Sequence, residues 1–350
     1  MRTDHHPHLA GRSVALVLAC AALAIPAGAS TQRAHAPTGP VWPAPPDPPR
    51  IRYVGSVATD RDPGAKRSWT DRVRGFVLGE RASRLGRPVG IWAGSDGTVL
   101  VCDPATATVF EIRTRDGSMR PFVSGGRLAT PVGVTRMPDH TTWICDADRG
   151  VILRYDERGV WKGEAGAGLL VRPTGIAYDP VRDRLYVADA QAHHIAVFDG
   201  QGRHLTDLGQ RGTGDGEFNF PTDVKVTSSG DLMVCDALNC RVERISPDGA
   251  FRGRFGRSGD GRGDFARPKG VALDGDGHVY VVDALFDVMQ IFDADGMLLL
   301  VVGCSGVGDG QFNLPSAVAI DAQDRIYVSD SANRRLQVFE YLRPPGGIKR

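Results

Sequence analysis

Short hydrophobic runs alternate with turns rich in glycine and aspartate over most of this 350-residue chain. One stretch shows the pattern clearly, with apolar runs at 270–274, 278–283, 288–292 and 297–302. Runs of five or six residues rich in Val, Ile, Tyr and Phe, separated by such turns, are typical of antiparallel strands joined by hairpins. The pattern therefore predicts units of four short strands.

These units repeat with a fixed internal spacing. In six segments a proline opens an apolar stretch, and fifteen or sixteen residues later a hydrophobic run ends on an aspartate. The pairs are Pro88 and Asp103, Pro131 and Asp146, Pro173 and Asp189, Pro221 and Asp236, Pro268 and Asp283, and Pro315 and Asp330. The aspartates are 43, 43, 47, 47 and 47 residues apart, a period found in propeller blades and helical arrays. Helical repeats would space apolar residues by three and four with few glycines, so β-blades are favoured.

The sixth repeat ends after its third predicted strand, at residues 335–341. A propeller has to close into a ring, and residues 50–57 have the pattern of a fourth strand such as 251–256. We expect residues 50–57 to act as a clasp strand that completes the last blade and covers its unpaired edge. The predicted fold is all-β, a six-bladed β-propeller of four-stranded antiparallel blades closed by this clasp, with one short inserted helix.

The inserted helix is predicted within residues 58–87, which no repeat explains. Ser68–Asp71 form a capping box, apolar residues follow at helical spacing, and Gly79 provides a stop signal. These signals predict an amphipathic helix over 69–78. Its apolar face would pack on the propeller or, alternatively, dock to a partner or a membrane surface.

Several motifs resemble those of the NHL-repeat family of six-bladed β-propellers. They are clearest in Pro268-Lys-Gly-Val-Ala272, Ile326-Tyr-Val-Ser-Asp330, Asn333-Arg-Arg-Leu336 and the linker Gly212–Phe218. The resemblance covers roughly residues 86 to 341, although the first two repeats lack the Asn-x-Arg element. It implies the fold but no single activity, because the family includes RNA-binding and protein-binding modules as well as a lyase.

The N-terminus has the features of a signal peptide over residues 1–29. Two arginines precede a twelve-residue apolar run at 14–25, and Ala27-Gly28-Ala29 forms a cleavage site before Ser30. The apolar run is too short to cross a bilayer. We expect an exported, bacterial-type NHL repeat protein, periplasmic or extracellular. The alternative is a lipoprotein anchored at Cys20.

The remaining domain boundaries follow from composition. A proline-rich linker is expected at 30–49, the propeller at 50–342 with its six repeats at 88–342, and a short tail at 343–350. Removing residues 1–29 takes two of 42 basic residues and one of 41 acidic residues, which leaves 40 of each. Phosphate-backbone binding needs concentrated positive charge, so we expect no nucleic-acid partner. We also expect no transmembrane segment and a monomeric protein.

Five cysteines remain in the mature chain. Cys102, Cys145 and Cys235 occupy one column, immediately before the repeat aspartate, where a small residue fits a tightly packed core. We expect them to be packing residues. Cys235 and Cys240 are the one local pair that could form a disulfide.

Candidate chemistry is sparse in this sequence. A catalytic zinc site needs about three protein ligands and one open position, yet only His193 and His194 are placed on the face where the propeller pocket is expected. No Gly-x-Ser-x-Gly motif occurs. We expect the repeat aspartates to cap turns rather than to catalyse. No metal and no cofactor are therefore expected.

The polar residues left on this face are candidates for binding a protein, peptide or glycan through hydrogen bonds. They are His193, His194, Asn219, Asn239, Lys269, Asn313, Asn333 and Arg335. Lys269 and Arg335 are expected to be exposed, whereas Arg241 and Arg334 are expected to lock turns. The alternative is that these residues lie in solvated loops, with the arginines and asparagines locking the turn after each aspartate, as the resemblance implies.

Two functions are consistent with these patterns. The favoured one is an exported, non-catalytic propeller that binds or scaffolds a partner. The alternative is a propeller lyase or hydrolase with a metal ion in the central channel.

Overall fold

The computed structural model describes residues 39–59 and 83–343. The expected signal peptide, the expected helix at 69–78 and the tail from residue 344 lie outside the described residues. The described chain is all-β apart from one 3-10 turn, η1 (Ala237–Asn239). None of the helices in this part of the chain is long and apolar enough to cross a membrane.

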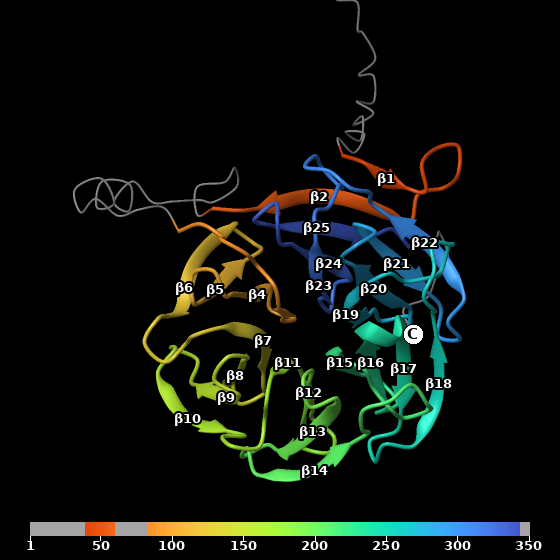
Figure 1. The fold of residues 1–350 in the computed structure, drawn as a ribbon. Coiled ribbons are helices and arrows are strands. Elements are labelled where there is room, and N and C mark those ends of the chain that lie inside the picture. Colours follow the sequence, from red (N-terminus) through yellow and green to blue (C-terminus); the bar gives the residue numbers. More distant parts are fainter. Residues whose placement is uncertain (1–38, 60–82, 344–350) are drawn as a thin grey trace, which may run out of the picture. The chain divides into compact units, whose positions relative to one another are not determined.

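Six antiparallel sheets are arranged around a central axis (Figure 1), and in five of them the strands follow each other in chain order. Blade 1 contains β3 (Ile91–Ala93), β4 (Thr98–Asp103), β5 (Thr108–Arg113) and β6 (Ser118–Ser124). Blade 2 contains β7 (Pro131–Arg136), β8 (Thr142–Asp146), β9 (Val151–Tyr155) and β10 (Trp161–Ala165). Blade 3 contains β11 (Pro173–Asp179), β12 (Arg184–Asp189), β13 (His194–Asp199) and β14 (His204–Leu208). Blade 4 contains β15 (Pro221–Val226), β16 (Leu232–Asp236), β17 (Arg241–Ile245) and β18 (Phe251–Phe255). Blade 5 contains β19 (Pro268–Leu273), β20 (Val279–Asp283), β21 (Val288–Phe292) and β22 (Leu298–Val302).

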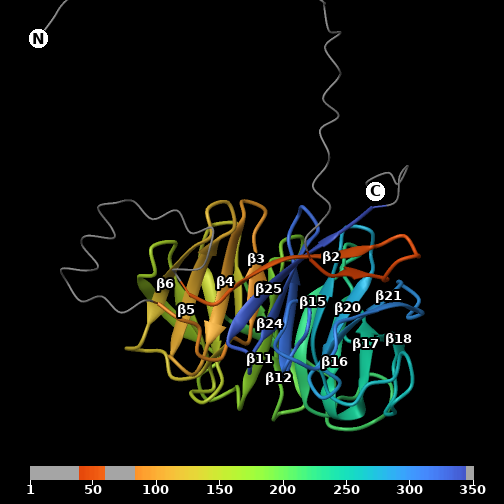
Figure 2. The same ribbon diagram turned by 90° about the horizontal axis from the view of Figure 1, so that it is seen from above.

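The sixth sheet is built from both ends of the described chain. Its inner strands are β23 (Pro315–Ile320), β24 (Arg325–Asp330) and β25 (Arg335–Tyr341), and β2 (Ile51–Val57) pairs antiparallel with β25. A two-residue strand, β1 (Val41–Trp42), adds a fifth position outside β2. Figure 1 and Figure 2 show β2 lying alongside β25, on the outer side of this blade. The N-terminal strand therefore occupies the outer position that the sixth repeat does not supply.

Each repeat aspartate is fully buried and accepts hydrogen bonds from the main chain of the loop that enters its own blade. In blade 3, Asp189 accepts from the N–H groups of Val171 at 2.7 Å, Arg172 at 2.8 Å and Ala192 at 3.3 Å. The other five repeat aspartates make the equivalent contact with the loop before the repeat proline. This arrangement confirms the prediction that the aspartates cap turns, because a buried N–H group needs an acceptor.

The inner strands pack closely because the ring of residues nearest the axis is small. A Cβ atom on Gly133 would lie 1.9 Å from the carbonyl oxygen of Thr174 in the next blade, so only glycine fits there. Cys102, Cys145 and Cys235 are completely buried between the blades, and all five described cysteines are free thiols. Burial raises the pKa of the Cys145 thiol well above its ordinary value. These cysteines are therefore packing residues, and Cys235 and Cys240 are not joined.

Candidate functional site

A cavity of about 630 Å³ opens at one end of the central channel, on the face that carries the turns after the repeat aspartates. Its wall is formed by residues of blades 1, 3, 4, 5 and 6. The polar side chains of the wall are Arg87, Thr174, Thr222, Arg267, Lys269, Ser316, Ser331 and Arg334. Among the described residues, no acidic and no aromatic residue lines this cavity. We call it the channel mouth.

Three arginines hold the position immediately before the repeat proline, in blades 1, 3 and 5. They are Arg87, Arg172 and Arg267. Their main-chain N–H groups donate to the repeat aspartates, which fixes the backbone while the side chains remain outside the turn. Arg87 and Arg267 line the mouth, and neither guanidinium has a hydrogen-bond or ion-pair partner within the described chain. Arg172 makes a 3.5 Å contact with the exposed Asp148.

Lys269 lies deeper, where the mouth narrows into the channel. Burial lowers the pKa of this lysine, and the positive charges of Arg267, Arg87 and Arg172 lower it further. Its ammonium group also has no hydrogen-bond or ion-pair partner among residues 39–59 and 83–343. A partly buried cation without a counter-ion is costly, because burial penalises the charged form.

The hydroxyl groups around the mouth are already engaged. Thr174 donates to the carbonyl oxygen of Ala188 at 3.0 Å, and Ser331 donates to that of Pro88 at 2.5 Å. Ser316 shares a 2.6 Å hydrogen bond with Ser331. The donors available in the mouth are therefore the cationic side chains.

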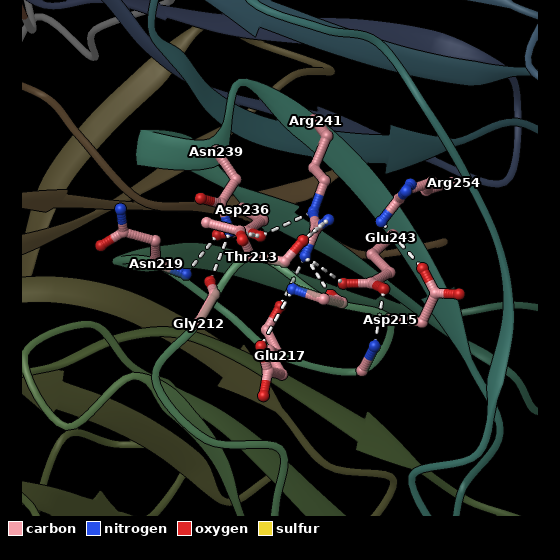
Figure 3. A network of polar contacts seen from close by, with 12 residues as sticks. Gly212, Thr213, Asp215, Glu217, Asn219, Asp236, Asn239, Arg241, Glu243 and Arg254 are labelled. Atoms are coloured by element: carbon pink, nitrogen blue, oxygen red, sulfur yellow. Dashed lines mark hydrogen bonds and ion pairs between the residues drawn. The ribbon is translucent and has the colours of Figure 1, made fainter.

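The asparagines predicted to bind a partner are held inside the turns. The side-chain amide of Asn239 donates to Asp236 at 2.7 Å and to the carbonyl oxygen of Gly212 at 2.9 Å (Figure 3). Asn333 makes the same two contacts in blade 6, with Asp330 and Gly306, both at 2.8 Å. Asn219 and Asn313 each donate their backbone N–H to the repeat aspartate of their blade. The structure thus brings these four residues into the turn network.

Arg241 is the centre of the most connected of these turns. Its guanidinium bonds to Asp236 at 2.9 Å and Glu243 at 3.1 Å, and to the carbonyl oxygens of Thr213, Gly214 and Glu217 (Figure 3). All three charged side chains are buried. Arg241 therefore ties its own blade to the linker that arrives from blade 3, as expected for a turn-locking residue.

Arg335 occupies the same position in blade 6, and the expectation that it is exposed was wrong. It bonds to Asp330 at 2.7 Å and to the carbonyl oxygens of Gly308 and Gln311, and its side chain is 12 % exposed. Arg334 was expected to lock the turn, but it has a positive φ of 58° and an exposed side chain that lines the mouth. The two residues exchange roles because Arg335 pairs in register with Asp330. Arg335 follows Asp330 by five residues, as Arg241 follows Asp236. This shared spacing could have identified Arg335 as the turn-locking residue from the sequence.

The two candidate histidines are involved in local contacts. His193 accepts a hydrogen bond from the N–H of Phe220 at 3.1 Å through Nδ1, and His194 lies 3.6 Å from Asp207. The described residues contain no group of three or more His, Cys, Asp or Glu side chains placed to hold a metal ion. The donors present do not fit the three-ligand centre that a metal-dependent lyase would need.

A second polar cluster lies at the opposite end of blade 5, beside another cavity of about 630 Å³. Asp274 accepts from His278 Nδ1 at 2.7 Å and from the hydroxyl of Tyr280 at 3.0 Å. The hydrogen bond to Asp274 raises the pKa of His278. Burial opposes ionisation of Asp274, but the hydrogen bonds from His278 outweigh it and lower the pKa of this carboxyl group.

We predict that His278→Gln destabilises the fold most at pH values between 3.8, the ordinary pKa of an aspartate, and 6.5, the ordinary pKa of a histidine. Because the pKa of His278 is raised in the folded protein, the charged histidine stabilises the fold at pH values below the pKa of the unfolded chain. This contribution is lost as the pH rises through the pKa of the folded protein. We expect a loss below about 1 kcal/mol at pH 5.5, because the His278 side chain is partly exposed, and a smaller loss at pH 9. Urea unfolding at both pH values measures it. His140→Asn, in the equivalent turn of blade 2, should show no such change between the two pH values.

Comparisons with known proteins agree with this architecture. Residues 312–339 match the family described as NHL repeat, and residues 172–242 match the family described as 6-bladed beta-propeller. A 78-residue segment is 32 % identical to E3 ubiquitin-protein ligase NHLRC1 of Rattus norvegicus, which covers 22 % of this chain and 20 % of the relative. The matched segment therefore spans about a fifth of that relative's length.

Two solved structures have the same fold at low identity. An auxiliary nutrient binding protein from Bacteroides thetaiotaomicron aligns with a TM-score of 0.59 and 15 % identity, covering 73 % of this chain and 69 % of that one. Virginiamycin B lyase from Staphylococcus aureus aligns with a TM-score of 0.53 and 14 % identity, covering 73 % of this chain and 96 % of that one. The repeat pattern, the six sheets and the family matches together show that this chain is a six-bladed β-propeller in which residues 312–339 match the NHL repeat.

Proposed function

We propose that this propeller is an exported, non-catalytic and monomeric binding or scaffold module for a protein, peptide or glycan partner, which it engages at the channel mouth. The observation that supports this proposal is the set of cations around the mouth that have no partner among the described residues. Arg87, Arg267 and Arg334 are exposed, and none of the described residues that line the cavity is a carboxylate. Arginine is favoured at binding hot spots because its planar donors pair with acceptors on a partner.

Two further features enter the proposal. Export is inferred from the sequence of residues 1–29. The β2 strand would act as the clasp that keeps the ring, and with it the mouth, in one arrangement, which is supported by its pairing with β25. The described histidines give no support to the metal-dependent alternative.

We predict that Arg87→Ala, Arg267→Ala and Arg334→Ala combined abolish capture of the partner that the parent protein retains from an exported proteome. The melting temperature should change little, because exposed side chains typically contribute within about 0.5 kcal/mol each. Affinity capture with mass spectrometry identifies the partner and measures its loss. The matched control combines Arg115→Ala, Arg252→Ala and Arg262→Ala, three exposed arginines outside the mouth. Equal capture by both triple variants would contradict the proposal.

A further inference from the structure

We propose that the channel mouth is a binding site for an organic oxyanion, a carboxylate or a phosphate ester with an apolar body, whose charged group is bound by Lys269 and the surrounding arginines. This inference rests on the proposed function and adds the chemistry of the group that the mouth recognises. It follows from three independent features of the cavity.

The first feature is the charge of the wall. Arg87, Arg267, Lys269 and Arg334 all line the mouth, and no carboxylate is among the described residues that line it. Asp223 lines the narrow channel, and it is engaged with Lys225 at 2.6 Å and the N–H of Val271 at 3.1 Å. A bound anion would supply the missing counter-charge. Guanidinium and ammonium groups are the donors that bind carboxylate and phosphate most strongly.

The second feature is the position of Lys269 below the arginines. Lys269 lines both the narrow channel and the mouth, whereas Arg87, Arg267 and Arg334 line the mouth alone. Burial and the neighbouring arginines lower the pKa of Lys269, so a bound anion would favour its charged form. The channel below has a much smaller cavity volume, of about 60 Å³. The charged group of the ligand should therefore stop at Lys269.

The third feature is the apolar part of the wall. Leu285 and Leu314 line the mouth and remain 58 % and 45 % exposed. They would contact an apolar body attached to the charged group. Single-stranded nucleic acid is usually bound by aromatic side chains that stack on bases, and none of the described residues that line this cavity is aromatic. The mouth is thus better suited to an organic anion than to a nucleic acid.

The experiment is a calorimetric titration of the full chain with four probes: octanoate, octyl phosphate, inorganic phosphate and the uncharged octanamide. We expect the two alkyl anions to bind, inorganic phosphate to bind at least about tenfold more weakly, and octanamide not to bind. Octanoate and octyl phosphate distinguish a carboxylate from a phosphate ligand. Binding should weaken as salt is raised from 0.05 to 0.5 M, roughly the range over which exposed charges become screened.

Two variants test the residues. Lys269→Met keeps the aliphatic stem and should weaken binding of the alkyl anion at least about tenfold, because the group removed is the cation of the mouth that also reaches the narrow channel. Lys162→Met is the matched control, since Lys162 is on β10 and pairs with Asp156 at 3.0 Å, outside the mouth. Arg267→Gln provides a second mouth variant if Lys269→Met does not fold.

The outcomes separate this inference from the proposed function. Equal affinity of octanoate for the parent, Lys269→Met and Arg267→Gln would overturn it, as would equal binding of octanamide. Tighter binding of an oligouridylate than of either alkyl anion, lost in the same variants, would also overturn it in favour of nucleic acid. If partner capture depends on the three mouth arginines but no alkyl anion binds, this inference fails and the proposed function stands. If the anions bind through Lys269 but the triple arginine variant still captures the partner, the proposed function fails and the anion site stands.

Discussion

Replacing Arg241 with alanine is expected to destabilise the propeller by about 3–5 kcal/mol, because the substitution leaves two buried carboxylates without their cation. Arg241 is the cation that bonds to both Asp236 and Glu243, and both acids are completely buried. The same guanidinium satisfies three carbonyl oxygens of the linker between blades 3 and 4. Unpaired polar groups in that turn would add to the loss.

The pH dependence of this variant gives a second measurement. Burial raises the pKa of Asp236 and of Glu243 in the folded protein, even with Arg241 present. Removing Arg241 should raise both pKa values further, so the folded variant holds more protons than the unfolded chain. Its stability therefore falls as pH rises, and the deficit relative to the parent should be smaller at pH 5 than at pH 8.

Chemical unfolding of Arg241→Ala at both pH values tests these expectations. Arg334→Ala is the matched control, because Arg334 is exposed and should change stability by less than about 0.5 kcal/mol. The loss of stability caused by Arg335→Ala should be smaller than that of Arg241→Ala and larger than that of Arg334→Ala. Asp330 keeps the amides of Asn333 and Gln337 as donors, and an uncharged Gln337 replaces the second carboxylate. A loss for Arg241→Ala no greater than that for Arg334→Ala would show that the buried network contributes little to stability.

The sequence contains enough information to predict the blades but not the direction of each polar side chain. The spacing of Pro173 and Asp189 becomes a register pair between β11 and β12, and the aspartate caps the turn as predicted. That result follows from local turn chemistry, which repeats in every blade. The roles of Arg334 and Arg335 depended on which of two adjacent residues pairs with Asp330 across the strands. A shift of one residue reverses the side chain, so the prediction placed the wrong arginine inside.

The cationic mouth was missed for a different reason. The chain has nearly balanced charge, with 42 basic and 41 acidic residues. This balance argued against a positively charged face, but it holds for the whole chain and not for each surface. Arg87, Arg172 and Arg267 share one column of the repeat, immediately before the proline, and come together only when the ring brings three blades to one opening. Comparing the residue before the proline across all six repeats would have revealed this cluster of arginines. Lys269 was chosen as a candidate, yet its depth in the channel depends on the packing of β19 against its neighbours.

The strand β2 is expected to contribute strongly to stability because it covers the edge of β25. Ile51 is fully buried in the same hydrophobic cluster as Phe339, and Tyr53 packs edge-on against Phe339 with 5.7 Å between ring centroids. Without this strand, the backbone groups of β25 and the apolar side chains beneath it would face solvent. Deleting residues 50–57 should therefore lower the melting temperature far more than deleting residues 346–350.

A point substitution separates the packing of β2 from the effect of chain length. Ile51→Ala should destabilise the protein by about 2–5 kcal/mol, the usual cost of truncating a large side chain in a packed core. Val54→Ala in the same strand should have little effect, because Val54 is 56 % exposed. Thermal unfolding of the two variants compares an inward with an outward position on one strand, with the main-chain pairing intact. If the two variants have the same melting temperature, the packing of Ile51 does not anchor β2 to the core. The proposed clasp would then not hold the ring closed.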